Sequence, residues 1–136
     1  LTAADRTTTG QVLTDVASLV TGTLAANSRY QFRARLQVQS SSTAGNGYAM
    51  NYTGTVTGID YIITGTLAAA TQKTVRVNAN ASAQTFVTSG STGGIWIEGT
   101  LRTGATPGVL SVQHLKVTSG TSTVFNYSIL EIKKIA

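Results

Sequence analysis

The sequence has no cysteine, one proline, one histidine and one tryptophan, and only 11% of its 136 residues are charged. Without cysteine the domain has neither disulfides nor thiolate metal ligands, so its stability has to come from packing or from assembly. The low charge excludes a charged disordered segment, because disorder of that kind needs many charges and few apolar residues. Thr, Ser, Val and Gly are abundant while Glu, Lys and Met are scarce, and this composition favours strands and tight turns.

Groups that carry acid–base or metal chemistry are also scarce. Asp and Glu number five in total, and the one histidine, His114, lies within a strand-like pattern with no catalytic motif beside it. Catalysis and metal binding both need such groups in pairs or clusters. The common hydrolase, zinc-protease and phosphate-loop motifs are missing from the sequence. We therefore expect a protein that is not an enzyme and that holds no catalytic residue, metal or cofactor.

Long apolar runs and basic stripes are missing as well. No run approaches the roughly 20 residues that span a bilayer, so we expect no membrane partner. Ten Lys and Arg against five Asp and Glu give a net charge of +5, but most basic residues are scattered singly. We therefore expect no nucleic-acid partner, while an anionic partner surface stays open. The chain begins at Leu1 rather than Met, which we interpret as trimming or excision from something longer.

What the sequence does contain is a series of strand patterns. In residues 30–39, apolar side chains alternate with Gln and Arg for ten residues, which is typical of an antiparallel strand with one face on the core. Residues 94–102 and 109–117 are expected to form a hairpin closed by a turn at Pro107 and Gly108. Further strands are expected at residues 10–16, 19–24, 48–53, 59–64, 73–78, 84–88 and 123–133.

Eight to ten short strands at this spacing, without a convincing helical repeat, predict an all-β fold, an antiparallel sandwich of the jelly-roll kind. No linker or internal repeat divides the chain. We therefore expect residues 1–136 to form a single jelly-roll domain, with residues 1–10 as a candidate extended N-terminal arm.

Two sets of side chains are candidates for binding. Aromatic rings with a polar edge suit sugars as well as proteins, and the candidate glycan contacts are Tyr48, Tyr52 and Trp96; the other interpretation places these rings in the core or at a subunit interface. Arg33 and Arg35 point to the polar face of the strand at 30–39. That face is either solvated or an interface with another subunit or a capsid, since Arg is enriched at protein interfaces.

Two motifs carry a resemblance to a known family. Asn27 and Tyr30 form an Asn-x-x-Tyr turn before an apolar strand, and Ser128, Leu130 and Ile135 form a final Ser-x-Leu-x-x-x-x-Ile strand. In these features the chain resembles, over about residues 12–135, a jelly-roll module of tailed-phage structural proteins. It departs from the family's pattern at Tyr52, where proline often follows the asparagine.

The resemblance implies a trimeric jelly roll of the tumour-necrosis-factor and C1q type, used on virions as a head decoration protein, a head fibre or a fibre tip. It places the strands at 30–39 and 123–133 in the sheet nearest the three-fold axis. The candidate subunit or capsid interface is then formed by Tyr30, Phe32, Arg33, Arg35, Phe125 and Tyr127.

Two functional hypotheses follow from these observations. The first is a non-enzymatic phage virion structural protein, a homotrimer on the virion surface that decorates and cements the assembled head by binding the major capsid protein or another virion protein. Selective binding to the assembled lattice would stabilise it by mass action. The alternative is a receptor-binding tip module of a tail or head fibre, with a host glycan as its partner.

Overall fold

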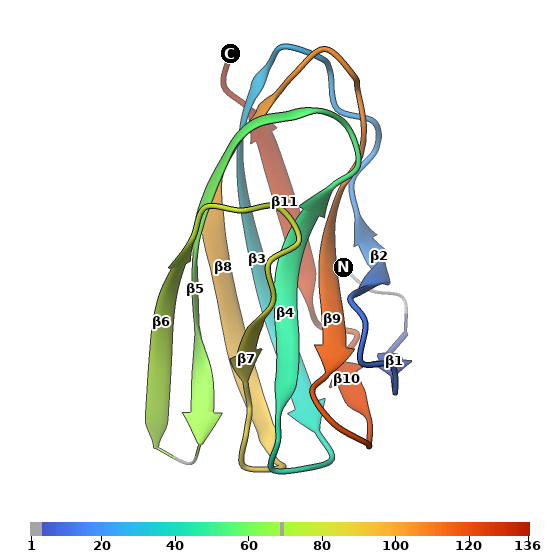
Figure 1. Ribbon diagram of the computed structural model, residues 1–136, viewed down its shortest axis with the longest axis vertical. Coiled ribbons are helices and arrows are strands. Elements are labelled where there is room, and N and C mark those ends of the chain that lie inside the picture. The colour runs from blue at the N-terminus through green and yellow to red at the C-terminus, as the bar shows by residue number, and fades with distance from the viewer. Residues whose placement is uncertain (1–3, 69) are drawn as a thin grey trace.

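The computed structural model describes residues 4–68 and 70–136, and in these residues eleven strands form two antiparallel sheets packed face to face (Figure 1). No helix occurs in the described residues. The strands are β1 (Arg6–Thr8), β2 (Thr14–Val20), β3 (Arg29–Ser40), β4 (Asn46–Tyr52), β5 (Val56–Ala68), β6 (Thr71–Val77), β7 (Gln84–Phe86), β8 (Thr92–Thr103), β9 (Leu110–Lys116), β10 (Ser122–Val124) and β11 (Ile129–Lys134).

The strand order identifies the sandwich as a jelly roll. One sheet has seven strands in the order β1-β10-β3-β8-β5-β6, with β11 also pairing with β3, and the other has four in the order β2-β9-β4-β7. From β2 to β9 the chain changes sheet at every step except the β5–β6 hairpin. This alternation is the double Greek key of a jelly roll. The predicted all-β, antiparallel jelly-roll sandwich is confirmed.

β3 shows why these residues form strands. Its burial alternates strictly along all twelve residues, so the predicted division into an apolar and a polar face is correct. The inward side chains join the core between the sheets, where the rings of Phe32 and Tyr61 meet edge to face with centroids 6.0 Å apart. β3, β5 and β8 have 12 to 13 residues each. The expectation of eight to ten short strands was therefore too low in number and too short in length.

The predicted hairpin around Pro107 is wrong. β8 pairs with β3 and β5, whereas β9 pairs with β2 and β4 in the other sheet. The connection between β8 and β9 forms its backbone hydrogen bonds with a neighbouring loop, whereas a hairpin turn would form them between its own two ends. Gly104 N donates to Thr55 O, and Thr106 O accepts from Thr55 N. Gly108 crosses so close that a Cβ there would lie 2.2 Å from the Gly54 nitrogen. A proline–glycine pair thus marks a crossover between sheets here.

Both ends of the chain also differ from expectation. The predicted strand at 123–133 is two strands, β10 and β11, separated by a turn in which Ser128 N donates to Phe125 O at 3.1 Å. Near the N-terminus, β1 lies inside the expected arm and pairs with β10. β2 replaces the strands expected at 10–16 and 19–24; its register shifts between Asp15 and Val20. That irregularity breaks the two-residue period by which a strand is recognised in sequence.

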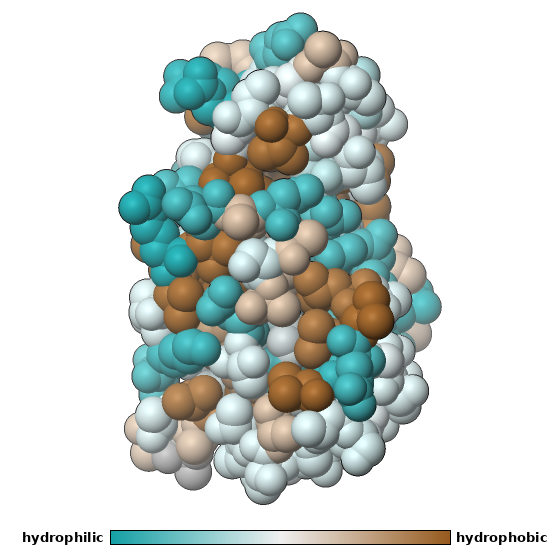
Figure 2. Space-filling model, viewed as in Figure 1, coloured by the Kyte–Doolittle hydropathy of each residue, from teal (hydrophilic) through white to brown (hydrophobic). Residues whose placement is uncertain are grey.

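The outer face of the four-stranded sheet is largely covered. Six of the seven residues of β4 are buried, and the segment between β6 and β7 is hydrogen-bonded to this strand. Asn80 of that segment accepts a hydrogen bond from Tyr52 N and donates to Tyr52 O, at 2.8 and 3.0 Å, and Ala81 N donates to Met50 O. Seen from the side of Figure 1, hydrophobic side chains form separate patches among hydrophilic ones (Figure 2). The seven-stranded sheet therefore offers the more open face.

A buried polar cluster joins β9 to its neighbours at one end of the sandwich. His114 Nδ1 lies 3.0 Å from Ser122 Oγ, and Lys116 Nζ donates to the carbonyl oxygen of Gly45. Both side chains are at most 2% exposed. Burial disfavours the charged imidazolium and lowers the pKa of His114 to about 4.

This burial predicts acid sensitivity. An unfolded chain with a histidine pKa near 6.5 takes up the proton first as the pH falls, so the free energy of unfolding decreases between pH 6.5 and 4, by up to about 3 kcal/mol. Urea denaturation at pH 7 and pH 4.5 measures the loss. His114→Gln keeps a hydrogen-bonding side chain but does not titrate, so its stability should fall less over the same range. Equal losses in the two proteins would contradict a neutral, buried His114.

Candidate functional site

The outer face of the seven-stranded sheet carries a ladder of polar side chains on β3 and β8. The register places Arg33 opposite Glu98, Arg35 opposite Trp96, and Gln37 opposite Gly94. All six residues are exposed, because their side-chain positions alternate with those that enter the core. Both strands are paired along their whole contact, so the ladder stands on a rigid part of the fold rather than on loops.

Trp96 is the exposed aromatic ring of this ladder. Its side chain is 39% exposed, and the Arg35 guanidinium carbon lies 5.0 Å from the ring centroid. Trp96 Nε1 donates to Glu98 Oε2 at 3.4 Å. Cation–π contact and hydrogen bond both restrict the ring's orientation. The ring is therefore held in place on the surface before any ligand arrives.

Beside Trp96, Gly94 leaves a hollow in the surface. Its volume is about 210 Å³, and Arg35, Gln37, Thr64 and Gln72 contribute to its lining together with Trp96. A Cβ at Gly94 would meet only one atom within 4 Å, the carbonyl oxygen of Leu36 at 4.0 Å, and its φ is not positive. Neither packing nor backbone geometry requires glycine here, although glycine weakens a strand. Such a glycine often marks a place where a ligand approaches the backbone.

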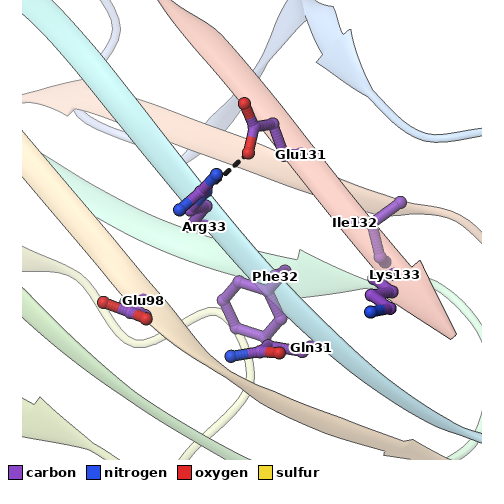
Figure 3. Close-up of a pocket in the computed structure, with 7 residues that line it drawn as sticks. All are labelled: Gln31, Phe32, Arg33, Glu98, Glu131, Ile132 and Lys133. Carbon is purple, nitrogen blue, oxygen red and sulfur yellow. Dashed lines mark hydrogen bonds and ion pairs between the residues drawn. The ribbon is translucent and has the colours of Figure 1, made fainter. Parts of the chain in front are cut away.

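A second hollow of about 290 Å³ lies on the same face between β11, β3 and β8 (Figure 3). Arg33 Nε donates to Glu131 Oε2 at 2.5 Å across it, and Glu98, Gln31 and Lys133 complete its polar lining. The bonded Glu131 carboxylate raises the pKa of Arg33. Both partners are about half exposed, so the pair adds little stability. This hollow contains charges of both signs.

The other ion pair of the described residues lies further across the same face. Arg76 bonds both carboxylate oxygens of Asp60, which lowers the pKa of that carboxyl. These two ion pairs leave other basic side chains of the face without a carboxylate partner in the described chain. They are Arg29, Arg35, Arg102 and Lys133.

The predicted interface residues fall into two groups. Tyr30 and Phe32 are 6% and 1% exposed and belong to the core, so their assignment to an interface is wrong. Arg33 and Arg35 lie on the outer face as expected. Tyr127 is 73% exposed and Phe125 is half-buried, and both follow β10 rather than forming one strand with β11.

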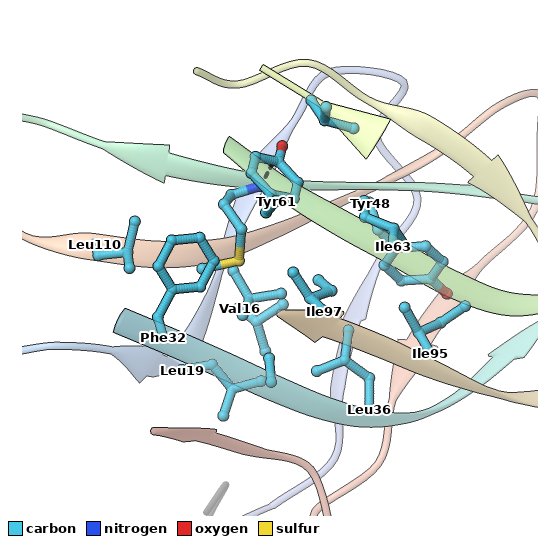
Figure 4. Packing of buried hydrophobic residues seen from close by; sticks show 14 of the residues in the cluster. Val16, Leu19, Phe32, Leu36, Tyr48, Tyr61, Ile63, Ile95, Ile97 and Leu110 are labelled. Atoms are coloured by element: carbon cyan, nitrogen blue, oxygen red, sulfur yellow. Dashed lines mark hydrogen bonds between the residues drawn. The ribbon is translucent and has the colours of Figure 1, made fainter. Parts of the chain in front are cut away.

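The predicted glycan contacts divide in the same way. Tyr48 and Tyr52 are at most 1% exposed, and Figure 4 shows the Tyr48 ring among the core side chains. Burial raises the pKa of both phenols. Their assignment as sugar contacts is wrong because both rings lie on the face of β4 that packs against the other sheet, whereas Trp96 lies on the outer face of its sheet. Gly94, Thr64 and Gln72 were missed, since only strand register brings them together.

Two features are absent from the residues that the structure describes. No group of three or more His, Asp or Glu side chains lies close enough together to hold a metal ion there. Nor does that part of the chain include a helix long and apolar enough to cross a lipid bilayer.

No family model matches the chain, and no curated protein is significantly similar to it in sequence. Among solved structures, the chain is similar to the carbohydrate-binding module TmCBM61 in complex with beta-1,4-galactotriose, at 10% identity and a TM-score of 0.38 over 96% of this chain and 90% of that one. A second similarity, to infectious bursal disease virus Gx strain, has 13% identity and a TM-score of 0.20 over 99% of this chain and 41% of that one. Scores this low establish nothing finer than the sandwich that the strand order already shows.

Because the space above Gly94 is open, we predict that a larger side chain is tolerated at Gly94 but not at Gly99, another glycine of β8. Gly99 faces β5, where a Cβ would lie 2.3 Å from Asp60 O and from Tyr61 Cβ. Gly94→Val should unfold within about 0.5 kcal/mol of the unmodified protein, whereas Gly99→Ala should lose about 3 kcal/mol through overpacking. Urea denaturation of the three proteins measures both effects. A Gly94→Val variant as unstable as Gly99→Ala would mean that the hollow is closed.

Proposed function

We propose that this domain is a non-enzymatic glycan-binding module that holds a sugar ring in the hollow over Gly94, against Trp96. The observation that carries the proposal is the exposed, fixed indole ring beside a strand position left without a side chain. The Trp96 ring provides an apolar surface and Gly94 provides space beside it, and a sugar ring with one apolar face requires both.

The polar side chains that line the hollow supply the hydrogen bonds that a sugar needs. A pyranose ring has an apolar C–H face, which suits an aromatic ring, and a rim of hydroxyls, which need donors and acceptors. Gln37 and Gln72 each provide an amide donor and acceptor, and Thr64 provides a hydroxyl. These groups come from three different strands and converge on one hollow.

The site is preorganised but shallow. Its residues lie on paired strands, and contacts with Arg35 and Glu98 restrict Trp96, so binding needs little ordering of the protein. An open hollow buries only part of a sugar, so we expect weak affinity for one domain. Several copies displayed together would raise the effective affinity by multivalency.

Glycan binding is tested by screening the 136-residue chain, clustered on a multivalent support, against a glycan array, followed by calorimetric titration of the best glycan. Trp96→Ala removes the platform and Gly94→Val fills the floor, so each should weaken binding at least about tenfold. Gly22→Val and Tyr127→Ala are the matched controls, since both positions are exposed and lie off the ladder, and nothing lies within 4 Å of a Cβ at Gly22. Silence on the array, or full binding by the first two variants, would refute the proposal.

A second candidate function is the one that the sequence resemblance implies: a homotrimeric phage decoration subunit on the virion surface that binds the major capsid protein. It is favoured by the apolar and arginine side chains of the same outer face, where Ile62 is 48% exposed and lies opposite Glu98, on the face that also presents Trp96 and Arg33. Trp and Arg are enriched among residues that dominate protein–protein affinity. The net charge of +5 suits an acidic capsid surface.

Assembly is tested by light scattering during size exclusion at low and high salt. The decoration hypothesis predicts three times the mass of one chain, and Ile62→Asp should dissociate the trimer because it places a charge in the contact. Val12→Asp is the control, since Val12 is exposed but lies outside the seven-stranded sheet. A monomer at every concentration and salt would contradict this candidate and leave the glycan site unaffected.

A further inference from the structure

We propose that the glycan bound by this site is acidic, and that its anionic group is bound by Arg35. This inference rests on the proposed glycan-binding function and adds the chemical class of the ligand. It derives from the charges around the two hollows, which differ.

The Gly94 hollow contains one kind of charge. Arg35 is the one ionisable side chain among the described residues that line it; the others are neutral polar or apolar. The second hollow, by contrast, contains Glu98 and Glu131 beside Arg33 and Lys133. An anion therefore meets an uncompensated positive charge in the first hollow and two carboxylates in the second.

Arg35 is free to bind such an anion. In the described part of the chain its side chain forms neither an ion pair nor a hydrogen bond, and it contacts the face of the Trp96 ring through a cation–π interaction. Stacking leaves the N–H groups at the edge of the guanidinium plane unused. That planar edge matches the two oxygens of a carboxylate or a sulfate bidentately.

The register places this charge where a bound sugar needs it. Arg35 lies directly opposite Trp96, and both line the hollow whose floor is Gly94. A sugar ring against the indole therefore has the guanidinium beside it, so a substituent outside the ring reaches Arg35. At the N–H of the indole, Glu98 accepts a hydrogen bond from Trp96 and repels an anion. The two charges thus fix the direction in which an acidic sugar lies.

The remaining charges of the face act at longer range. Arg29, Arg102 and Lys133 share the outer face and have no carboxylate partner in the described chain. Together they attract an anionic polysaccharide, and salt screens this attraction over about 10 Å at 0.1 M. A test of Arg35 must therefore separate its local contact from this general field.

The experiment compares an acidic sugar with a neutral copy of the same shape. The array carries neutral, uronic-acid and sulfated oligosaccharides; the best uronic-acid oligosaccharide is then titrated alongside its methyl ester. We expect the acid to bind about tenfold more tightly than the ester, the size of one charge-assisted hydrogen-bonding contact. Arg35→Gln should remove this ratio, and Arg35→Lys should restore part of it. Because both ligands need the same Trp96 platform, the ratio is insensitive to small movements of the ring.

Arg102→Gln is the matched control for the general field. Arg102 lies on the same face of β8 and is likewise unpaired, but it is eight residues from Gly94 along the strand. Its variant should keep the acid-to-ester ratio, and an equal loss in both variants would overturn the assignment to Arg35. A sulfated sugar that binds best and depends on Arg35 supports the same inference with sulfate as the anion. Neutral sugars that bind equally well through Trp96 and Gly94 overturn the acidic preference alone, whereas no binding to any glycan overturns the proposed function as well.

Discussion

The strict alternation of side chains along β3 is the constraint on which the rest of the structure depends. The inward set fills the core of a domain that has no disulfide, and the outward set forms one side of the polar ladder. β3 also pairs with β8 along one edge and with β10 and β11 along the other, so it organises the larger sheet. A shift by one residue would exchange core and surface along the whole strand.

The two sheets differ in what covers them, and this difference decides where a ligand has access. In the smaller sheet nearly all of β4 is buried, and Asn80 joins the β6–β7 segment to Tyr52. The outer face of β3 and β8 has no such cover, and its side chains are exposed in alternation. Aromatic rings also have opposite roles according to the face of the strand on which they lie: Tyr48 points between the sheets and stabilises the core, whereas Trp96 points outward and is available on the surface.

The proposed functions place different demands on the same face. Glycan binding needs Trp96 accessible, and its weak single-site affinity gains from display in several copies. A trimer that buried Ile62 and Trp96 together would close the Gly94 hollow, whereas a trimer formed through another surface would present three such hollows. The two hollows also differ in charge, since one contains Arg35 as its single charged side chain and the other contains two acidic and two basic side chains. The arrangement favours the Gly94 hollow as the place where an anionic ligand binds.

The amino-acid pattern alone predicts the all-β class, the jelly-roll fold, the two faces of β3 and the exposure of Arg33 and Arg35, because alternation with a period of two is a local property of an extended backbone. It also singled out Trp96. Tertiary contacts alone place β8 and β9 in different sheets, bury Tyr48 and Tyr52 in the core, and make Gly94 the floor of a hollow. The reason is physical: which strands pair, and what covers the second face of a strand, depends on contacts between residues far apart in the chain, and no local pattern records them.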